Sequence, residues 1–305
     1  MNESRFGIEI ETCVKDVNTS EFDEESDYST KFSDHYVDNL NKILKKNHIG
    51  DRFVNHFLAH KDKSGRFIGN TNWYIDNDDS VDCEVEYEDD KKKLKFFPIE
   101  MVTRVFDYDS DSIEIFEKVY REAIMSDGFI YLDNQTQGLH ITISHPLQNA
   151  EHFLKFFWYF EPFIMGCLPI FRRTSDYAVS LRKMFGRIRV KDFKGDPSIT
   201  IEDIIKYAIE KKSFDTSAVN LRKKNGEIYA FEIRVINSNV GSYRHHINWV
   251  HFLIHLLWAS ITKTIDVRVN LEMSALSEKM FDLLEIPDNL KLFFMDLYRE
   301  HSKIL

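Results

Sequence analysis

Apolar and polar side chains alternate in four short segments that lie far apart along the chain. Such alternation predicts β-strands, because successive side chains of a strand point to opposite faces. In the last segment three apolar residues share one face, and Glu232 and Arg234 share the other. The four segments are 6–11, 97–102, 138–143 and 230–235. Together they predict one sheet that is apolar on one face and lined on the other by Glu9, Glu11, Glu100, His140, Glu232 and Arg234.

Apolar residues at helical spacing, with polar caps, predict helices between these strands. The expected helices cover 34–46, 52–60, 110–126, 149–163, 200–212 and 242–262, with two more after Asn270. Hairpins are expected over 82–96 and across Lys224-Asn225-Gly226. This order favours an α+β fold with a mostly antiparallel, curved sheet backed by helices. We expect a single domain over 1–305, with a helical insertion at about 15–72 and a C-terminal helical segment at about 270–305.

Composition and charge narrow the classes of function. The 305 residues include 40 basic and 50 acidic side chains, a net charge of −10 that argues against broad binding to nucleic acid or anionic membranes. The most apolar run, 153–171, is interrupted by charges and prolines, so no membrane span is expected. Cys13, Cys83 and Cys167 are widely spaced and suggest no disulfide framework. A reducing compartment, the cytoplasm, is therefore the expected location.

The polar face of the predicted sheet carries the candidate chemistry. One Glu-x-Glu or Glu-x-Arg strand alone is more often the solvated face of a half-exposed sheet. Four such strands together supply many carboxylates and one imidazole, a set that suits Mg²⁺ or Mn²⁺ better than structural zinc. Crowded carboxylates repel one another, and a bound cation would relieve that repulsion. Arg234, on the face of Glu232, is placed to reach a phosphate.

The order of these segments resembles the amidoligase family, which is similar in fold to glutamine synthetase and glutamate–cysteine ligase. The resemblance covers roughly Arg5 to Trp258, and each motif alone is weak whereas the ordered set is fairly specific. The motifs are Phe6-Gly7-Ile8-Glu9-Ile10-Glu11, Trp73 with Asp78-Asp79-Ser80, Ile99-Glu100-Met101-Val102-Thr103, Gly138-Leu139-His140-Ile141-Thr142, Leu168-Pro169-Ile170-Phe171-Arg172-Arg173 with Asp176-Tyr177-Ala178, and Val219-Asn220-Leu221 running to Phe231-Glu232-Ile233-Arg234.

The resemblance implies ATP-dependent joining of a carboxylate to an amine through an acyl phosphate. It implies that Arg234 and Arg172 stabilise the transferred phosphoryl group, that Asn220 helps to hold the nucleotide, and that Asp78 and Ser80 help to deprotonate or orient the amine. The implied substrate is an amino acid, a peptide or a protein end, and a homo-oligomer is possible. The implied ligands of two or three Mg²⁺ ions are Glu9, Glu11, Glu100, His140 and Glu232.

Two other classes of function stay open. The same carboxylates would serve a two-metal hydrolase or phosphotransferase, which needs no amine acceptor. Alternatively, the chain is a non-catalytic binding or interaction protein that has kept the fold. That alternative is favoured by Thr142, which stands where the family often has a second histidine. His251 and His255 have metal-ligand spacing, but their apolar neighbours favour core histidines.

A basic run between 182 and 194 could collect an anionic substrate. Gly186 and Gly195 make a solvated, mobile loop at least as good an interpretation of that run.

Overall fold

The computed structural model describes residues 1–305 except 2, 17–27, 56–71, 79, 82, 84–95, 127, 133–135, 177, 268–271 and 303–305. The chain forms two compact units. The amino-terminal unit comprises Gly7–Leu139 and Ser238–His246, and the carboxy-terminal unit comprises Met1–Phe6, His140–Asn237 and Ile247–Leu305. None of the helices in the described residues is long and apolar enough to cross a membrane. The single-domain prediction stays a prediction.

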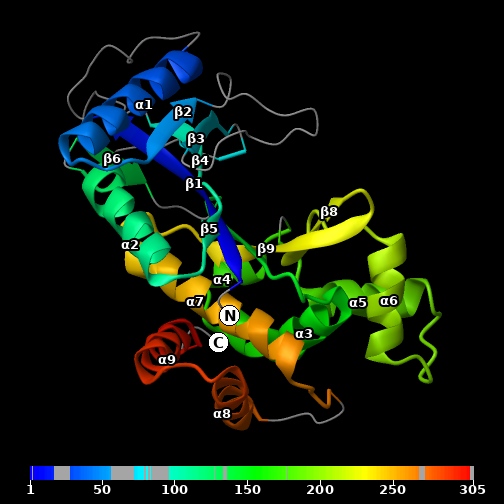
Figure 1. The fold of residues 1–305 in the computed structure, drawn as a ribbon. Coiled ribbons are helices and arrows are strands. Elements are labelled where there is room, and N and C mark those ends of the chain that lie inside the picture. The colour runs from blue at the N-terminus through cyan, green and yellow to red at the C-terminus, as the bar shows by residue number, and fades with distance from the viewer. Residues whose placement is uncertain are drawn as a thin grey trace. The chain divides into compact units, whose positions relative to one another are not determined.

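The amino-terminal unit is a helix packed on a mostly antiparallel set of strands (Figure 1). The strands are ordered β2 (Arg52–Asn55), β3 (Asn72–Asn77), β4 (Phe97–Val102) and β1 (Arg5–Asp16), and the short β5 (Phe106–Asp107) and β6 (Phe129–Leu132) also pair with β1. Strands β2 and β3 pair in parallel, whereas the pairs β3–β4, β1–β4 and β1–β6 are antiparallel.

Helix α1 (Tyr28–Lys46) covers β2, β3 and β4. Its residues Tyr36 and Leu40 are fully buried, and Phe32 stacks on Phe97 of β4 with ring centroids 4.0 Å apart. Helix α2 (Ser110–Val119) continues as the π-helical turn η2 (Tyr120–Ile124). The cap of α2 is Asp109, one residue before the predicted start, and its carboxylate accepts the Ser112 N–H.

The helix predicted over 52–60 is wrong at its start. Residues Arg52–Asn55 form β2, and the rest of that prediction lies outside the described residues. Both backbone groups of the fully buried Phe53 bond to the Asn41 side chain, at 2.9 Å for the N–H and 2.8 Å for the carbonyl. These bonds fix β2 to α1. Most of the hairpin predicted over 82–96 also lies outside the described residues.

A disulfide joins Cys13 of β1 to Cys83, which corrects the prediction of no disulfide. The two cysteines are 70 residues apart in sequence, and their Cα atoms are 5.6 Å apart. Cys13 packs with Val81 and Phe96 in a small apolar cluster. Disulfides persist mainly in oxidising surroundings, so the cysteines no longer support a reducing compartment.

Breaking this disulfide is expected to lower the free energy of unfolding by about 4 kcal/mol, because a long loop of the unfolded chain is released. Urea unfolding of wild type and Cys83→Ser, each with and without a dithiol reductant, measures the effect. Reductant should destabilise wild type and leave Cys83→Ser unchanged. Equal curves for oxidised wild type and the variant would contradict the linkage.

The carboxy-terminal unit places helices against the strands β7 (Gly138–Ser144), β9 (Glu227–Asn237) and β8 (Val219–Lys224), in that order. The strands β8 and β9 form the predicted antiparallel hairpin. Its turn is Asn225-Gly226, with φ values of 52° and 84°, the left-handed pair that a tight hairpin turn requires.

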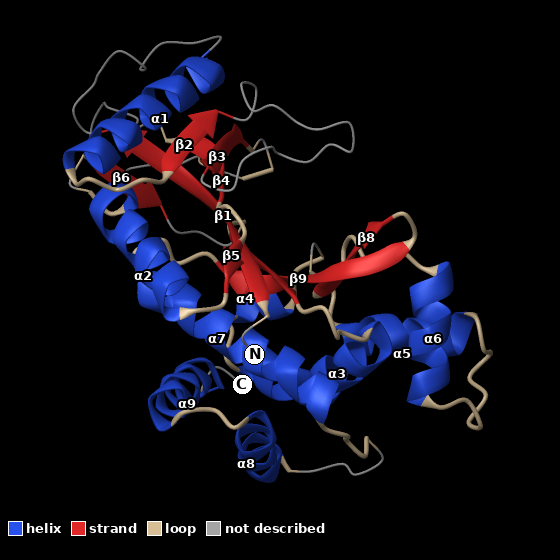
Figure 2. Cartoon of the chain, viewed as in Figure 1, coloured by secondary structure: helices blue, strands red, loops and turns tan. Residues whose placement is uncertain are grey.

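Helix α3 (Ala150–Gly166) is the centre of this unit. Its Phe153 stacks on Phe231 of β9 at 4.2 Å. It packs with α5 (Leu181–Lys191) and α6 (Ile201–Lys211), which lie beneath the hairpin in the view of Figure 2. It also contacts α8 (Met273–Leu284) and α9 (Asp288–Ser302). The remaining helices are α4 (Ile170–Arg173) and α7 (Tyr243–Thr262).

Most of the predicted elements are confirmed. The strands at 6–11, 97–102, 138–143 and 230–235 lie within β1, β4, β7 and β9, and the capping box of Thr200 with Asp203 opens α6. The described parts of the insertion and of the C-terminal segment contain α1 and α8–α9. The loop interpretation of the basic run is wrong, because residues 181–191 form α5.

Helix α3 contains Pro162, and the start of α5 is attached beside it. A proline has no N–H to give to the carbonyl four residues earlier, which here belongs to Trp158. The Arg182 Nε donates to that carbonyl at 3.2 Å, and its guanidinium lies 4.7 Å from the Trp158 ring centroid. The buried Glu161 carboxylate accepts the backbone N–H groups of Leu181 and Arg182 at 2.6 and 2.8 Å.

Candidate active site

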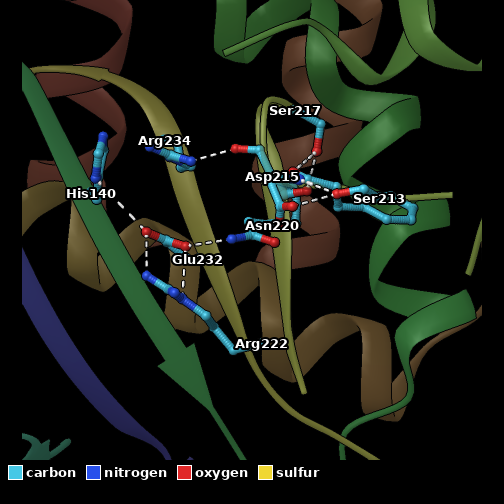
Figure 3. A network of polar contacts seen from close by, with 10 residues as sticks. His140, Ser213, Asp215, Ser217, Asn220, Arg222, Glu232 and Arg234 are labelled. Atoms are coloured by element: carbon cyan, nitrogen blue, oxygen red, sulfur yellow. Dashed lines mark hydrogen bonds and ion pairs between the residues drawn. The ribbon is translucent and has the colours of Figure 1, made fainter. Parts of the chain in front are cut away.

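Glu232 on β9 is the centre of a polar network in the carboxy-terminal unit (Figure 3). Its carboxylate is almost fully buried. Arg222 makes two contacts of 2.8 Å, from Nη2 to Oε1 and from Nε to Oε2. The Asn220 amide donates to Oε2 at 2.9 Å, and the His140 Nδ1 lies 3.8 Å from Oε1. A buried carboxylate is thus matched by three polar partners.

The pairing of β8 with β9 explains this arrangement. Asn220 lies directly opposite Glu232, where side chains of an antiparallel pair are closest. Arg222 is two residues further on β8, on the same face, and reaches Glu232 diagonally. The register shifts between Arg222 and Lys223, and such an irregularity bends a strand locally.

Arg234 lies on the same face of β9 as Glu232, and hydrogen bonds to two neighbouring backbone carbonyls hold it there. Its backbone N–H donates to the Ala218 carbonyl at 3.0 Å, and its Nη1 donates to the Asp215 carbonyl. Its Nε is buried and has no hydrogen-bond partner among the described residues. A buried guanidinium nitrogen without an acceptor is costly, so this atom is suited to an anionic ligand.

Arg172 lies beneath the backbone of β9. It is buried, and it donates to the carbonyls of Arg234 at 2.6 Å and Val235 at 3.3 Å. Two of its donors therefore hold the strand that carries Glu232 and Arg234. Its predicted contact with a phosphate stays a prediction.

Arg172→Met is expected to lower the free energy of unfolding by about 2–3 kcal/mol, because it removes the hydrogen bonds of a buried, charged donor to two carbonyls of β9. Chemical denaturation measures that loss, and nucleotide affinity is measured at a temperature where the variant is folded. Arg173→Met is the matched control. The bonds that it loses go to the carbonyls of Leu168, Gly166 and His301 rather than to β9. Full stability with lost nucleotide affinity would instead favour a direct ligand role.

A row of carboxylates crosses three strands of the amino-terminal unit. In the sheet register Glu100 of β4 lies opposite Glu11 of β1 and opposite Asp76 of β3. Burial raises the pKa of Glu100 to about 9, and repulsion from Glu9, Asp78, Glu11 and Asp76 adds to the rise. At neutral pH this carboxyl therefore holds a proton that a bound cation would displace.

Neighbouring backbone groups hold the row in place. Glu11 Oε2 accepts the Gly138 N–H at 2.7 Å. The Thr103 hydroxyl accepts the Ile8 N–H at 2.9 Å, which fixes the end of β4 to β1. Asp78 and Ser80 form a local turn, since the backbone N–H and the hydroxyl of Ser80 both donate to Asp78 Oδ1, at 2.9 and 2.6 Å.

The donor sets of both units fit a divalent cation. The amino-terminal unit holds a row of carboxylates, in which burial first and repulsion second raise the pKa of Glu100. The carboxy-terminal unit holds a buried carboxylate and an imidazole. Oxygen-rich sets of this kind suit Mg²⁺ or Mn²⁺.

The structure therefore arranges the predicted residues in two groups. Glu232, His140 and Asn220 are brought together in one unit, and Glu9, Glu11, Glu100 and Asp78 in the other. The sequence interpretation missed Arg222 and Asp76. Asp76 lies two residues before Asp78, and Arg222 lies two residues after Asn220 on the same face of β8, so the spacing in sequence was a detectable signal for each. His255 is a core histidine as expected, with Nδ1 2.8 Å from the Leu284 carbonyl.

Comparison with known proteins identifies the family. Two solved structures are similar at 11% identity and a TM-score of 0.46 each: glutamate–cysteine ligase from Francisella tularensis in complex with AMP, over 100% of this chain and 83% of that one, and a bifunctional glutathione synthetase from Pasteurella multocida, over 99% of this chain and 47% of that one. Among proteins with curated descriptions, none matches the chain. The profile of the family described as "Putative amidoligase enzyme" matches residues 2–257. The chain therefore belongs to the amidoligase family.

Proposed function

We propose that the protein is an ATP- and Mg²⁺-dependent carboxylate–amine ligase with a fold like that of glutamine synthetase. Membership of the amidoligase family supports an amide-forming ligase. The observation that carries the ATP and metal part is the pairing of two features on β9. Glu232, buried and hydrogen-bonded, lies two residues from Arg234, whose buried Nε has no acceptor in the part of the chain that the structure describes. A metal ligand beside an anion ligand is what phosphoryl transfer requires.

The proposed metal ligands are the five predicted residues. Glu9, His140 and Glu232 offer ligand atoms of the kinds that such ions take. Glu11 and Glu100 add carboxylates from the acidic row. When bound, Mg²⁺ would neutralise phosphate charge during transfer to the substrate carboxylate.

The chain's own residues have distinct tasks in this proposal. Arg234 binds a phosphoryl oxygen through Nε, and Arg172 keeps the backbone of Arg234 in place. Asn220 orients the Glu232 carboxylate, and it would help to hold the nucleotide. Asp78, with Ser80 hydrogen-bonded to it, accepts a hydrogen bond from the incoming amine. The substrate is an amino acid, a peptide or a protein end.

Calorimetric titration of ATP with Mg²⁺ into the purified protein, beside an EDTA control, tests the proposal first. Metal-dependent binding is the expected result, and amines and carboxylates are then screened for ADP release. Release that requires an amine supports the ligase, whereas release without one favours a hydrolase or phosphotransferase. No binding at millimolar ATP would contradict the proposal and favour a binding protein.

A further inference from the structure

We propose that Arg222 is a resident counterion of Glu232, that a metal ion displaces it, and that the released guanidinium then binds a phosphate group of the bound nucleotide. This inference rests on the proposed function and adds a residue and an order of events to it. It concerns only the carboxy-terminal unit.

Arg222 occupies the same atoms that a metal would need. Its two nitrogens lie 2.8 Å from the two different oxygens of Glu232. A carboxylate that is 2% exposed needs a matching positive charge, and the bidentate guanidinium supplies it. A divalent cation on the same two oxygens would repel that guanidinium at close range. Binding of the metal to these oxygens therefore weakens the bidentate contact of Arg222 and competes with it.

The two partners of this ion pair differ in exposure. The Arg222 side chain is 43% exposed, whereas Glu232 is buried. Arg222 can therefore turn toward solvent without leaving a charge buried, and Glu232 cannot. Asn220 is also buried. It keeps its hydrogen bond to Oε2 and holds the carboxylate in place while the metal ion replaces the guanidinium of Arg222.

The released guanidinium has a defined kind of partner. On the same face of the hairpin lies Arg234, whose Nε has no partner within the described ranges. Two guanidinium groups on one face favour a phosphate, whose oxygens accept bidentate hydrogen bonds. Neighbouring Lys223 is already bonded to the Ile209 carbonyl at 3.1 Å, so it does not take this role.

Removing Arg222 should consequently raise the affinity for the metal and lower the affinity for the nucleotide. We would measure Mn²⁺ binding by calorimetry without nucleotide, and then binding of a non-hydrolysable ATP analogue at saturating Mn²⁺. Arg222→Met is expected to bind Mn²⁺ at least about tenfold more tightly than wild type, and the analogue about tenfold less tightly. Arg222→Lys should fall between, because it keeps the charge and loses the bidentate contact. Lys224→Met, an exposed cation on the same hairpin, should match wild type.

Circular dichroism establishes that each variant is folded, and Arg222→Lys carries the test if Arg222→Met does not fold. Unchanged or weaker Mn²⁺ binding in the Arg222 variants, with wild type binding Mn²⁺ and the analogue normally, would overturn this inference and leave the proposed function standing. Absence of Mn²⁺ binding in wild type and variants alike would overturn both. Mn²⁺ binding that appears only after Arg222 is replaced would support the displacement.

Discussion

Glu232→Gln is expected to reduce metal-dependent ADP release by about a hundredfold or more while the protein stays folded. Loss of groups that only orient a metal ligand costs 10- to 100-fold in activity, and a direct ligand should cost at least as much. The amide keeps the shape of the carboxylate, but it carries no charge. Arg222 loses its partner at little cost to stability, because it is 43% exposed.

The measurement is steady-state ADP release with Mg²⁺ and the amine identified in the screen, together with thermal unfolding. Glu227→Gln is the matched control, since Glu227 is an exposed residue of the same strand. We expect the control to behave as wild type. Undiminished turnover in Glu232→Gln would refute the metal assignment.

In the absence of divalent cations, the free energy of unfolding is expected to fall as pH rises from about 5 to about 9. The pKa of Glu100 is raised from 4.5 to about 9 in the folded chain, by burial first and by neighbouring carboxylates second. Between these values the folded chain holds a proton that the unfolded chain has lost. The contribution of this proton to the free energy of unfolding is therefore fully present below the pKa of the unfolded carboxyl. Above that pKa it decreases by up to about 1.4 kcal/mol per pH unit for one proton.

Mg²⁺ should oppose this loss, because it favours the ionised carboxylates. Urea unfolding at pH 5.5, 7.0 and 8.5, with EDTA or with Mg²⁺, measures both effects. Glu100→Gln should flatten the EDTA profile, since its amide resembles the protonated acid. Glu114→Gln, an exposed acid on α2, should retain the wild-type slope. Identical slopes for wild type and Glu100→Gln would refute the assigned cause.

The sequence pattern predicted the strands and their polar faces because a strand repeats every two residues. It did not give the register between strands, and register decides which carboxylates are neighbours. Glu100 lies between Glu11 and Asp76 only through the pairing of β1, β4 and β3. Asp76 was therefore missed although it is part of the row.

Arg222 was missed for a different reason. It begins a run of basic residues before the hairpin turn, and such a run is typical of a solvated strand end. The shift in register after it is invisible in sequence. The cysteine pair was missed because a separation of 70 residues is no recognisable spacing. The β2 strand, four residues long, is too short for periodicity to separate it from a helix.

Pro162 of α3 and Arg182 of α5 depend on each other, and this dependence can be looked for in other members of the family. The proline cannot donate the usual helical bond to the Trp158 carbonyl, and Arg182 of α5 donates to that carbonyl instead. The residue at position 162 therefore affects how useful an arginine at position 182 is. A relative with alanine at 162 would have a backbone N–H for the Trp158 carbonyl, so it would not need arginine at 182 for that bond. Correlated replacement of the two residues across the family would mark which relatives dock α5 on α3 in this way.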